Sequence, residues 1–366
     1  MTLQDVWIAV LALLDVVSGA ILAISFGYLL LPSALGFLVG GVGSLLTGLV
    51  TPISFQQENI VLSSDLTKDQ RQRVSMILGA ALLTGILGIA GLPEYIVESV
   101  GAEIFLGMLA GVGLYLTKVG FDLAKEDWLI GLPCLVVALL VQFLTDNLIW
   151  AVTASVLLGV IIKLVKDRLK DGETSTAEIV VPEYDSWWDG IRTEFKLVKP
   201  VVNFDVVIGS LALATLTLGG NIAYHAVNLD MAGTSGGYNA VSVVSGVADF
   251  ASSLFGGTAM EVIVSATATA PNPVVSGVLL MFGAAIIIAT GLVYKIAKYI
   301  PVSAMGGYLV VIGAVLVLPY NAMDAFAAGN PFVVAVTMGT TVSTNPFYGM
   351  IAGLLTKLVL GLLGVL

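Results

Sequence analysis

The sequence contains few charged residues: Lys, Arg, Asp and Glu together make up 11% of its 366 residues. Soluble domains carry about 25% charged residues, so this composition argues against a soluble fold. Hydrophobic residues account for 58% of the chain. We therefore expect a polytopic membrane protein whose surroundings are the lipid bilayer.

Cysteine and histidine each occur once, which limits the covalent and metal chemistry that the chain can support. Cys134 has no partner for an intrachain disulfide, and His225 by itself cannot build a zinc site. The net charge of −10 argues against nucleic acid as a partner. No nucleophile–base set, metal-spaced cluster or phosphate-cradling loop is apparent in the sequence. We therefore expect no metal, no cofactor and no enzymatic activity.

Apolar runs dominate what is present. Runs of about 17–25 residues, the length that crosses a bilayer as a helix, follow one another almost without gaps and predict an all-α fold of about fourteen spans. The first run starts without preceding basic residues, so we expect no cleavable signal peptide. The third segment, residues 51–64, and the tenth, residues 255–271, are too short and too polar for ordinary spans. We expect both to be discontinuous spans at membrane depth.

The two short segments also resemble each other. Residues 58–64 read Glu-Asn-Ile-Val-Leu-Ser-Ser, and residues 261–267 read Glu-Val-Ile-Val-Ser-Ala-Thr. Each lies in the third span of its half of the chain. This pattern predicts two inverted repeats of seven spans, because an odd number of spans places the halves in opposite orientations.

Glu261 is the strongest candidate for chemistry. A carboxylate at membrane depth costs several kcal/mol unless it is paired, hydrated or protonated, so such an acid is a functional candidate by default. We expect Glu261 to lie on a short half-helix, with Thr258 near its face, and to act as proton acceptor and substrate anchor. The alternative is a protonated glutamate that is hydrogen-bonded within the core.

Glu58, with its neighbours Gln56, Gln57 and Asn59, forms the expected partner cluster. If the third span faces the tenth, these side chains and the N–H groups at both half-helix starts converge on one small volume. Glu58 would then share substrate binding and proton coupling, and Gln56 and Gln57 would contact the substrate. The alternative is that this polar run belongs to an interfacial loop.

Further candidates lie in other spans. Asn221 and Tyr224, in the eighth span, offer an amide and a hydroxyl to a substrate. The adjacent Gly219–Gly220 pair is also typical of tight helix packing, which is the alternative for this region. Asp15 and Asp249 are deep acids in the first and ninth spans. Each is either a proton relay or a protonated packing residue.

Two motifs resemble a known family. Phe255-Gly256-Gly257-Thr258 leading to Glu261, followed by the stretch 299–307 (Tyr-Ile-Pro-Val-Ser-Ala-Met-Gly-Gly), is similar to the xanthine/uracil permease family of nucleobase–cation symporters. The sequence departs from the family pattern at Val262 and Val264, where the family has Asn and Gly. It also lacks an acid near residues 219–221, where the family's eighth span carries a second carboxylate.

The resemblance implies a fold and a division into domains. It implies fourteen spans in two inverted repeats, with the third and tenth spans formed by a short strand and a half-helix. A core domain would comprise residues 1–92 and 204–294. A gate domain would comprise residues 93–165 and 295–366, and residues 166–203 would form a polar linker. The resemblance also suggests a homodimer.

Taken together, these features predict a secondary active transporter that works by alternating access. From the resemblance, we expect symport of a nucleobase or a similar small planar metabolite. We expect coupling to H⁺, with Na⁺ as the alternative ion, because the candidate site offers isolated carboxylates. A second possibility is a transporter of a small inorganic or carboxylate anion on the same fold. A possibility of another class is a membrane scaffold that transports nothing.

The basic residues predict an orientation in the plasma membrane. Of the 15 Lys and Arg residues, all but Lys357 fall in joints that follow odd-numbered spans. The positive-inside rule then places the joint between spans seven and eight in the cytoplasm and both termini outside. The family resemblance implies the reverse.

Overall fold

The computed structural model describes residues 1–169, 181, 182, 184 and 186–364, without the side chains of residues 14, 15, 96–98 and 149. The chain forms two compact units. The first unit is made of Met1–Phe105 and Glu183–Val293, and the second of Leu106–Pro182 and Tyr294–Leu366. Each unit therefore combines one stretch from either half of the sequence. The core and gate roles assigned to such stretches stay predictions.

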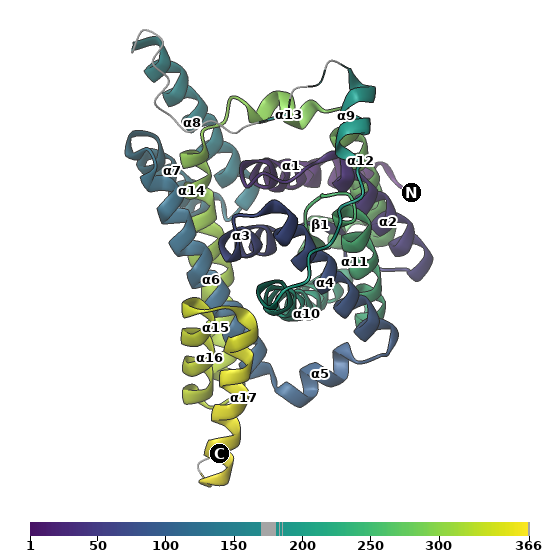
Figure 1. Cartoon of the computed structure of the whole chain (residues 1–366), viewed down its shortest axis with the longest axis vertical. Helices are drawn as coiled ribbons and strands as arrows, with labels where there is room; N and C mark the ends of the chain where they lie inside the picture. The colour runs from purple at the N-terminus through teal and green to yellow at the C-terminus, as the bar shows by residue number, and fades with distance from the viewer. Residues whose placement is uncertain (170–180, 183, 185, 365–366) are drawn as a thin grey trace. The chain divides into compact units, whose positions relative to one another are not determined.

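The first unit is helical, with two very short strands (Figure 1). Its elements are α1 (Leu3–Ser25), α2 (Leu31–Thr47), β1 (Ile53–Phe55), α3 (Gln57–Leu66), α4 (Gln70–Ile89), α5 (Pro93–Val100), α9 (Trp187–Glu194), α10 (Phe204–Ala232), α11 (Tyr238–Ser253), β2 (Met260–Val262), the 3₁₀ turn η1 (Ala266–Thr269) and α12 (Pro273–Ala289).

The second unit is helical in its described residues. Its elements are α6 (Ala102–Lys125), which starts at the end of the first unit, α7 (Trp128–Thr145), α8 (Leu148–Leu169), α13 (Leu292–Ala297), which starts in the first unit, α14 (Val302–Val310), the π-helix η2 (Val311–Val317), α15 (Leu318–Ala328), α16 (Pro331–Ser343) and α17 (Pro346–Leu362).

Many of these helices are long and apolar enough to cross a membrane. Within the described residues, six stretches qualify: α1, α4, α6, α7, α10 and the continuous run Val302–Ala328. Four shorter apolar helices, α2, α12, α16 and α17, accompany them. The predicted polytopic, mainly helical membrane fold is therefore confirmed, whereas the number of spans stays a prediction.

Small residues allow the helices of the first unit to pack closely. α11 lies against both α4 and α2, and α2 lies against α12 (Figure 1). A Cβ atom added at Gly246 of α11 would lie 2.8 Å from the backbone nitrogen of Gly85 in α4. Such backbone contact requires glycine at this point of the crossing. The tight helix packing fixes the walls around the two strands.

β1 and β2 pair in antiparallel fashion, with Ser54 opposite Glu261. β1 packs against α1 and α2, and β2 packs against α10 and α11. Residues 51–64 thus form a short strand followed by a ten-residue half-helix, α3, as expected for a discontinuous third span. Two segments far apart in the sequence meet in this pair, as the tenth-span prediction requires.

The tenth segment differs from the expectation in its second part. Glu261 lies in the middle of β2, and a single 3₁₀ turn of four residues follows in place of a half-helix. The side chain of Asn228 explains the difference, because its amide donates to the carbonyl of Ile263 at 2.8 Å and its oxygen accepts from the N–H of Ser265 at 3.0 Å. These bonds hold the backbone extended where a helix would need the same groups. The expectation that Glu261 and Thr258 share a helical face is wrong.

The segment predicted as a polar linker, residues 166–203, contains structure of its own where it is described. α9 is an eight-residue helix within it. The buried carboxylate of Glu194 at its end accepts from the backbone N–H of Leu31 at 2.9 Å and from the hydroxyl of Tyr184 at 2.6 Å. The indole N–H of Trp187 donates to the carbonyl of Ala289 at 2.5 Å. The end of the linker is therefore attached to α2 and α12 of the first unit.

Candidate functional site

Glu261 holds the central position of the strand pair in the first unit, and its carboxylate reaches α3 and α10. Its oxygen Oε1 accepts hydrogen bonds from the Asn59 amide of α3 and from the Thr217 hydroxyl of α10. Its other oxygen, Oε2, is buried and has no hydrogen-bond partner among the described residues. The side chain as a whole is 1% exposed. Glu261 therefore joins three separate segments of the chain through one of its two oxygens.

Glu58 lies at the start of α3, one residue before Asn59. The hydroxyl of Tyr224 on α10 donates to its carboxylate at 3.2 Å. Both Glu58 and Asp249 lie near enough to Glu261 to repel its negative charge. Glu58 and Tyr224 therefore lie beside Glu261 in the structure, although the tenth segment contributes a strand and no half-helix start. Glu58 is not the counterpart of Glu261 in the strand pair, however, since Ser54 holds that position.

Gln56 and Gln57 lie at the junction of β1 and α3. The backbone N–H of Gln56 donates to the carbonyl of Ala259 at 3.4 Å, which extends the strand pairing by one bond. The atoms Gln56 Nε2 and Gln57 Oε1 are buried and lack hydrogen-bond partners among the described residues. A Cβ atom added at Gly220 of α10 would lie 3.6 Å from Gln56 Nε2. Both glutamines therefore offer free polar atoms beside the strand pair.

Asp249 supports β2 from α11. Its Oδ1 accepts the backbone N–H of Met260, the neighbour of Glu261, at 2.5 Å. Within the described residues, neither Asp249 nor Glu261 forms an ion pair with Lys or Arg. The site thus concentrates acidic groups without a basic side chain bonded to these two. The side chain of Asp15, the other predicted deep acid, lies outside the described part of the structure.

The hydrogen bonds of Asn221 and Thr258 go to groups other than the Glu261 carboxylate. The Asn221 amide donates to the hydroxyl of Ser245 on α11 at 2.8 Å, so it faces that helix. The backbone N–H of Thr258 donates to Ser33 of α2 at 3.3 Å, and its carbonyl accepts from Ser252 of α11 at 2.8 Å. These bonds hold the approach to β2 in place. The structure gives neither residue a hydrogen bond to Glu261.

Sequence reasoning missed two residues that hold this site together, Thr217 and Asn228. Both lie on α10, and with Asn221 and Tyr224 they occupy positions i, i+4, i+7 and i+11. That spacing places four polar side chains on one face of a helix. This polar stripe was the available signal, and it follows the chain from Glu261 in β2 to Ser265 beyond the strand.

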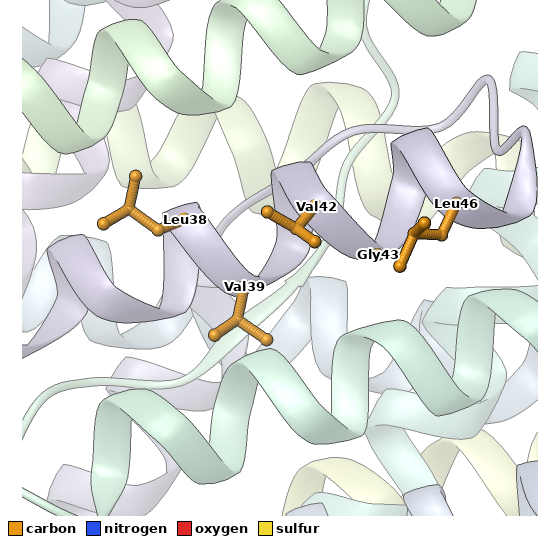
Figure 2. Close-up of a pocket in the computed structure, with 5 residues that line it drawn as sticks. All are labelled: Leu38, Val39, Val42, Gly43 and Leu46. Carbon is orange, nitrogen blue, oxygen red and sulfur yellow. The ribbon is translucent and has the colours of Figure 1, made fainter.

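A separate groove lies along α2 (Figure 2). It has a volume of about 350 Å³ and is lined by Leu38, Val39, Val42, Gly43 and Leu46. The four side chains among them are apolar and Gly43 has none, so the groove lacks a side chain that would recognise a polar solute. The surroundings of the strand pair, with their acidic and amide side chains, remain the candidate site.

The sequence matches no protein-family model, and no curated protein is significantly similar to it. Three of the solved structures that match its fold serve for comparison. The transmembrane domain of the cyanobacterium bicarbonate transporter BicA matches with a TM-score of 0.61 and 16% identity, over 93% of this chain and 96% of that one.

The other two structures belong to SLC26A9. One matches with a TM-score of 0.66 and 13% identity, over 97% of this chain and 65% of that one. The other, the murine Slc26a9 anion transporter in its inward-facing state, matches with a TM-score of 0.68 and 13% identity, over 99% of this chain and 68% of that one.

These comparisons correct the family assignment made from the motifs. The Phe-Gly-Gly-Thr motif at residues 255–258 and the stretch 299–307 suggested a xanthine/uracil permease, but no family model supports that assignment. Short motifs of glycine and small residues mark close packing and tight turns in many membrane folds, so they discriminate poorly between families. What the comparisons establish is that this chain shares its fold with the BicA transmembrane domain and with the matched part of SLC26A9.

Proposed function

We propose that this chain is a secondary active transporter that moves a small inorganic or carboxylate anion by alternating access. The observation that carries the proposal is the buried pairing of β1 with β2, in which two interrupted segments meet beside a cluster of polar side chains. Discontinuous spans of this kind are where secondary transporters place their binding sites. The shared fold with bicarbonate and anion transporters supports an anion as the cargo.

Charge decides which ion accompanies the cargo. Glu261, Asp249 and Glu58 would together repel an approaching anion if all were ionised. A proton on Glu261 removes its share of that repulsion and also lowers the cost of the carboxylate at membrane depth. Proton–anion symport therefore fits this site, with Glu261 as the proton acceptor and Glu58, Asp249 and Asp15 as candidate relays. Na⁺ remains the alternative coupling ion.

A nucleobase cargo has lost its support, because it rested on the family resemblance alone. The remaining architecture belongs to the proposal as well: fourteen spans in two inverted repeats, a core domain moving against a gate domain, a homodimer in the plasma membrane, and no enzymatic activity. The charge bias favours extracellular termini, and a cysteine introduced at the C-terminus tests that. Labelling by an impermeant reagent in intact cells supports the orientation, and protection contradicts it.

The purified protein in proteoliposomes tests the function directly. We expect uptake of bicarbonate, sulfate or a dicarboxylate to rise when an inward proton gradient is imposed. Glu261→Gln should lose the response to the gradient while still binding the anion, because its amide cannot take up the proton. Asp65→Asn, which changes an exposed acid outside the site, is the matched control. If none of these anions is taken up, with or without a proton gradient, the result would point to a scaffold.

A further inference from the structure

The two oxygens of the Glu261 carboxylate have different surroundings. Oε1 accepts from both Asn59 and Thr217, whereas Oε2 is buried without a partner among the described residues. Asn59 and Thr217 are themselves buried, with exposed fractions of 1% each. Buried polar atoms are normally satisfied, so an acid with one doubly bonded oxygen and one open oxygen calls for an explanation.

The donors form a closed arrangement. The Asn59 amide carries two hydrogens, one for Glu261 Oε1 and one for the Thr217 hydroxyl oxygen, which lies 3.1 Å away. Thr217 has a single hydrogen, and its oxygen lies 2.9 Å from the carbonyl of Leu213. The hydroxyl rotates, so its hydrogen can point at Glu261 instead of that carbonyl while its oxygen accepts from Asn59. Both donors then act on the same carboxylate oxygen.

We propose that Asn59 and Thr217 are positioning residues that hold Oε1 of Glu261 and so make Oε2 the oxygen that takes up and releases the coupling proton. This inference rests on the proposed function. In the proton-binding step, a hydronium ion from the site gives its proton to Oε2. One O–H bond forms on Oε2 and one O–H bond of hydronium breaks. The carboxyl group becomes neutral, and the resulting water molecule leaves. Release reverses these steps.

The arrangement also links the proton to conformation. Asn59 belongs to α3, Thr217 to α10 and Glu261 to β2, so a shift of α3 or α10 against the strand breaks a bond to Oε1. A carboxylate that loses a donor is less stabilised in its charged form and holds its proton more firmly. Movement of these segments within the first unit would therefore change proton affinity at the site.

Other titratable groups also face Glu261. They are Glu58 on α3, Tyr224 on α10 and Asp249 on α11, whereas α2 and β1 carry no titratable residue. None of these groups changes when Thr217 is replaced. A shift in the pH response of a Thr217 variant would therefore report the lost donor, not an altered charge.

The experiment compares Thr217→Val, which keeps the shape but removes the hydroxyl, with Thr217→Ser, which keeps the hydroxyl. Thr215→Val is the matched control, because Thr215 lies on the same helix and its hydroxyl donates to the Leu211 carbonyl at 2.7 Å. Infrared difference titration follows the protonated carboxyl band that Glu261→Gln abolishes. The pH dependence of anion uptake into proteoliposomes is measured in parallel.

Loss of one donor to a carboxylate should raise the midpoint of the infrared titration by about one pH unit. We expect that shift in Thr217→Val, a wild-type midpoint in Thr215→Val, and recovery toward wild type in Thr217→Ser. Asn59→Leu, which also removes a donor, should shift the midpoint in the same direction and serves if Thr217→Val does not fold.

Two results overturn the inference: a wild-type infrared midpoint in both donor-deletion variants, or an equal shift in Thr215→Val. A different result separates this inference from the proposed function. If the infrared midpoint shifts as expected but anion uptake ignores pH in every variant, the positioning role stands and the proton-coupled transport fails.

Discussion

The bond between Asp249 and the backbone of β2 gives the sharpest test of how the site is built. The side chain of Asp249 is 2% exposed, and its Oδ1 accepts the N–H of Met260 at 2.5 Å. Asp249→Ala removes this acceptor and leaves a buried N–H without a partner. Asp249→Asn keeps an oxygen at the same place but replaces an ionisable group near Glu261 with a neutral one.

The two substitutions should differ in magnitude. A buried donor that loses its acceptor costs about 1–3 kcal/mol of unfolding free energy, which is the loss expected for Asp249→Ala. Asp249→Asn keeps the hydrogen bond and replaces an ionisable group with a neutral one of nearly the same shape, so we expect a loss below about 1 kcal/mol. The acceptor, and not the charge, is therefore predicted to be what β2 requires.

The measurement is equilibrium unfolding of the detergent-purified variants, followed by the loss of helical circular dichroism at a fixed pH. Ser253→Ala is the control, because Ser253 lies one turn further along α11 and donates only to backbone carbonyls of that helix. Equal destabilisation by Asp249→Asn and Asp249→Ala would refute the reasoning, since the charge would then be the essential feature. Wild-type stability of Asp249→Ala would also refute it.

Three further predictions test other parts of the first unit. Gly246→Ala should lower the unfolding free energy by about 1–3 kcal/mol, because its Cβ would overlap the backbone of α4. Gly85→Ala should be neutral or stabilising, because its Cβ would meet nothing within 4 Å. Thermal unfolding of the two variants should therefore rank Gly246→Ala as the less stable, and the reverse ranking would contradict the prediction. Asn228→Leu should loosen the turn after β2 and increase the hydrogen exchange of its backbone amides. Unchanged exchange would show that the two hydrogen bonds of Asn228 do not hold this turn. Tyr184→Phe should increase proteolysis near α9 at every pH below about 10, because burial and Glu194 raise the pKa of Tyr184 and keep its hydroxyl protonated; equal cleavage of both proteins would refute this.

Much of the fold follows from local sequence. The scarcity of charge and the long apolar runs determine a polytopic helical membrane protein, since only helices or closed barrels satisfy backbone groups in lipid. The short polar stretch at residues 51–64 and the Gly- and Pro-bounded stretch at residues 255–271 identified the two segments that meet in the strand pair. Glu58 and Glu261 were candidates because an acid at membrane depth is costly. These inferences need only composition, length and chemical type.

The conformation of residues 260–267 was decided by tertiary structure alone. Their small and β-branched residues suit a helix or a strand, so local propensity leaves the choice open. β1 supplies strand partners for Met260–Val262, and Asn228 occupies the backbone groups beyond them. Those partners lie far away in the sequence. They place Glu261 in a strand, whereas the sequence predicted a helix.

The shape of the site was also decided by distant contacts. The sequence shows that Asn59, Thr217 and Glu261 are polar residues in apolar surroundings, but no spacing relates α3, α10 and β2 to one another. Only the packed structure brings both donors onto one carboxylate oxygen and leaves the other open. The sequence by itself determined which residues must avoid lipid. The tertiary structure decided which of them bond together, because hydrogen bonds depend on distances that only the folded chain sets.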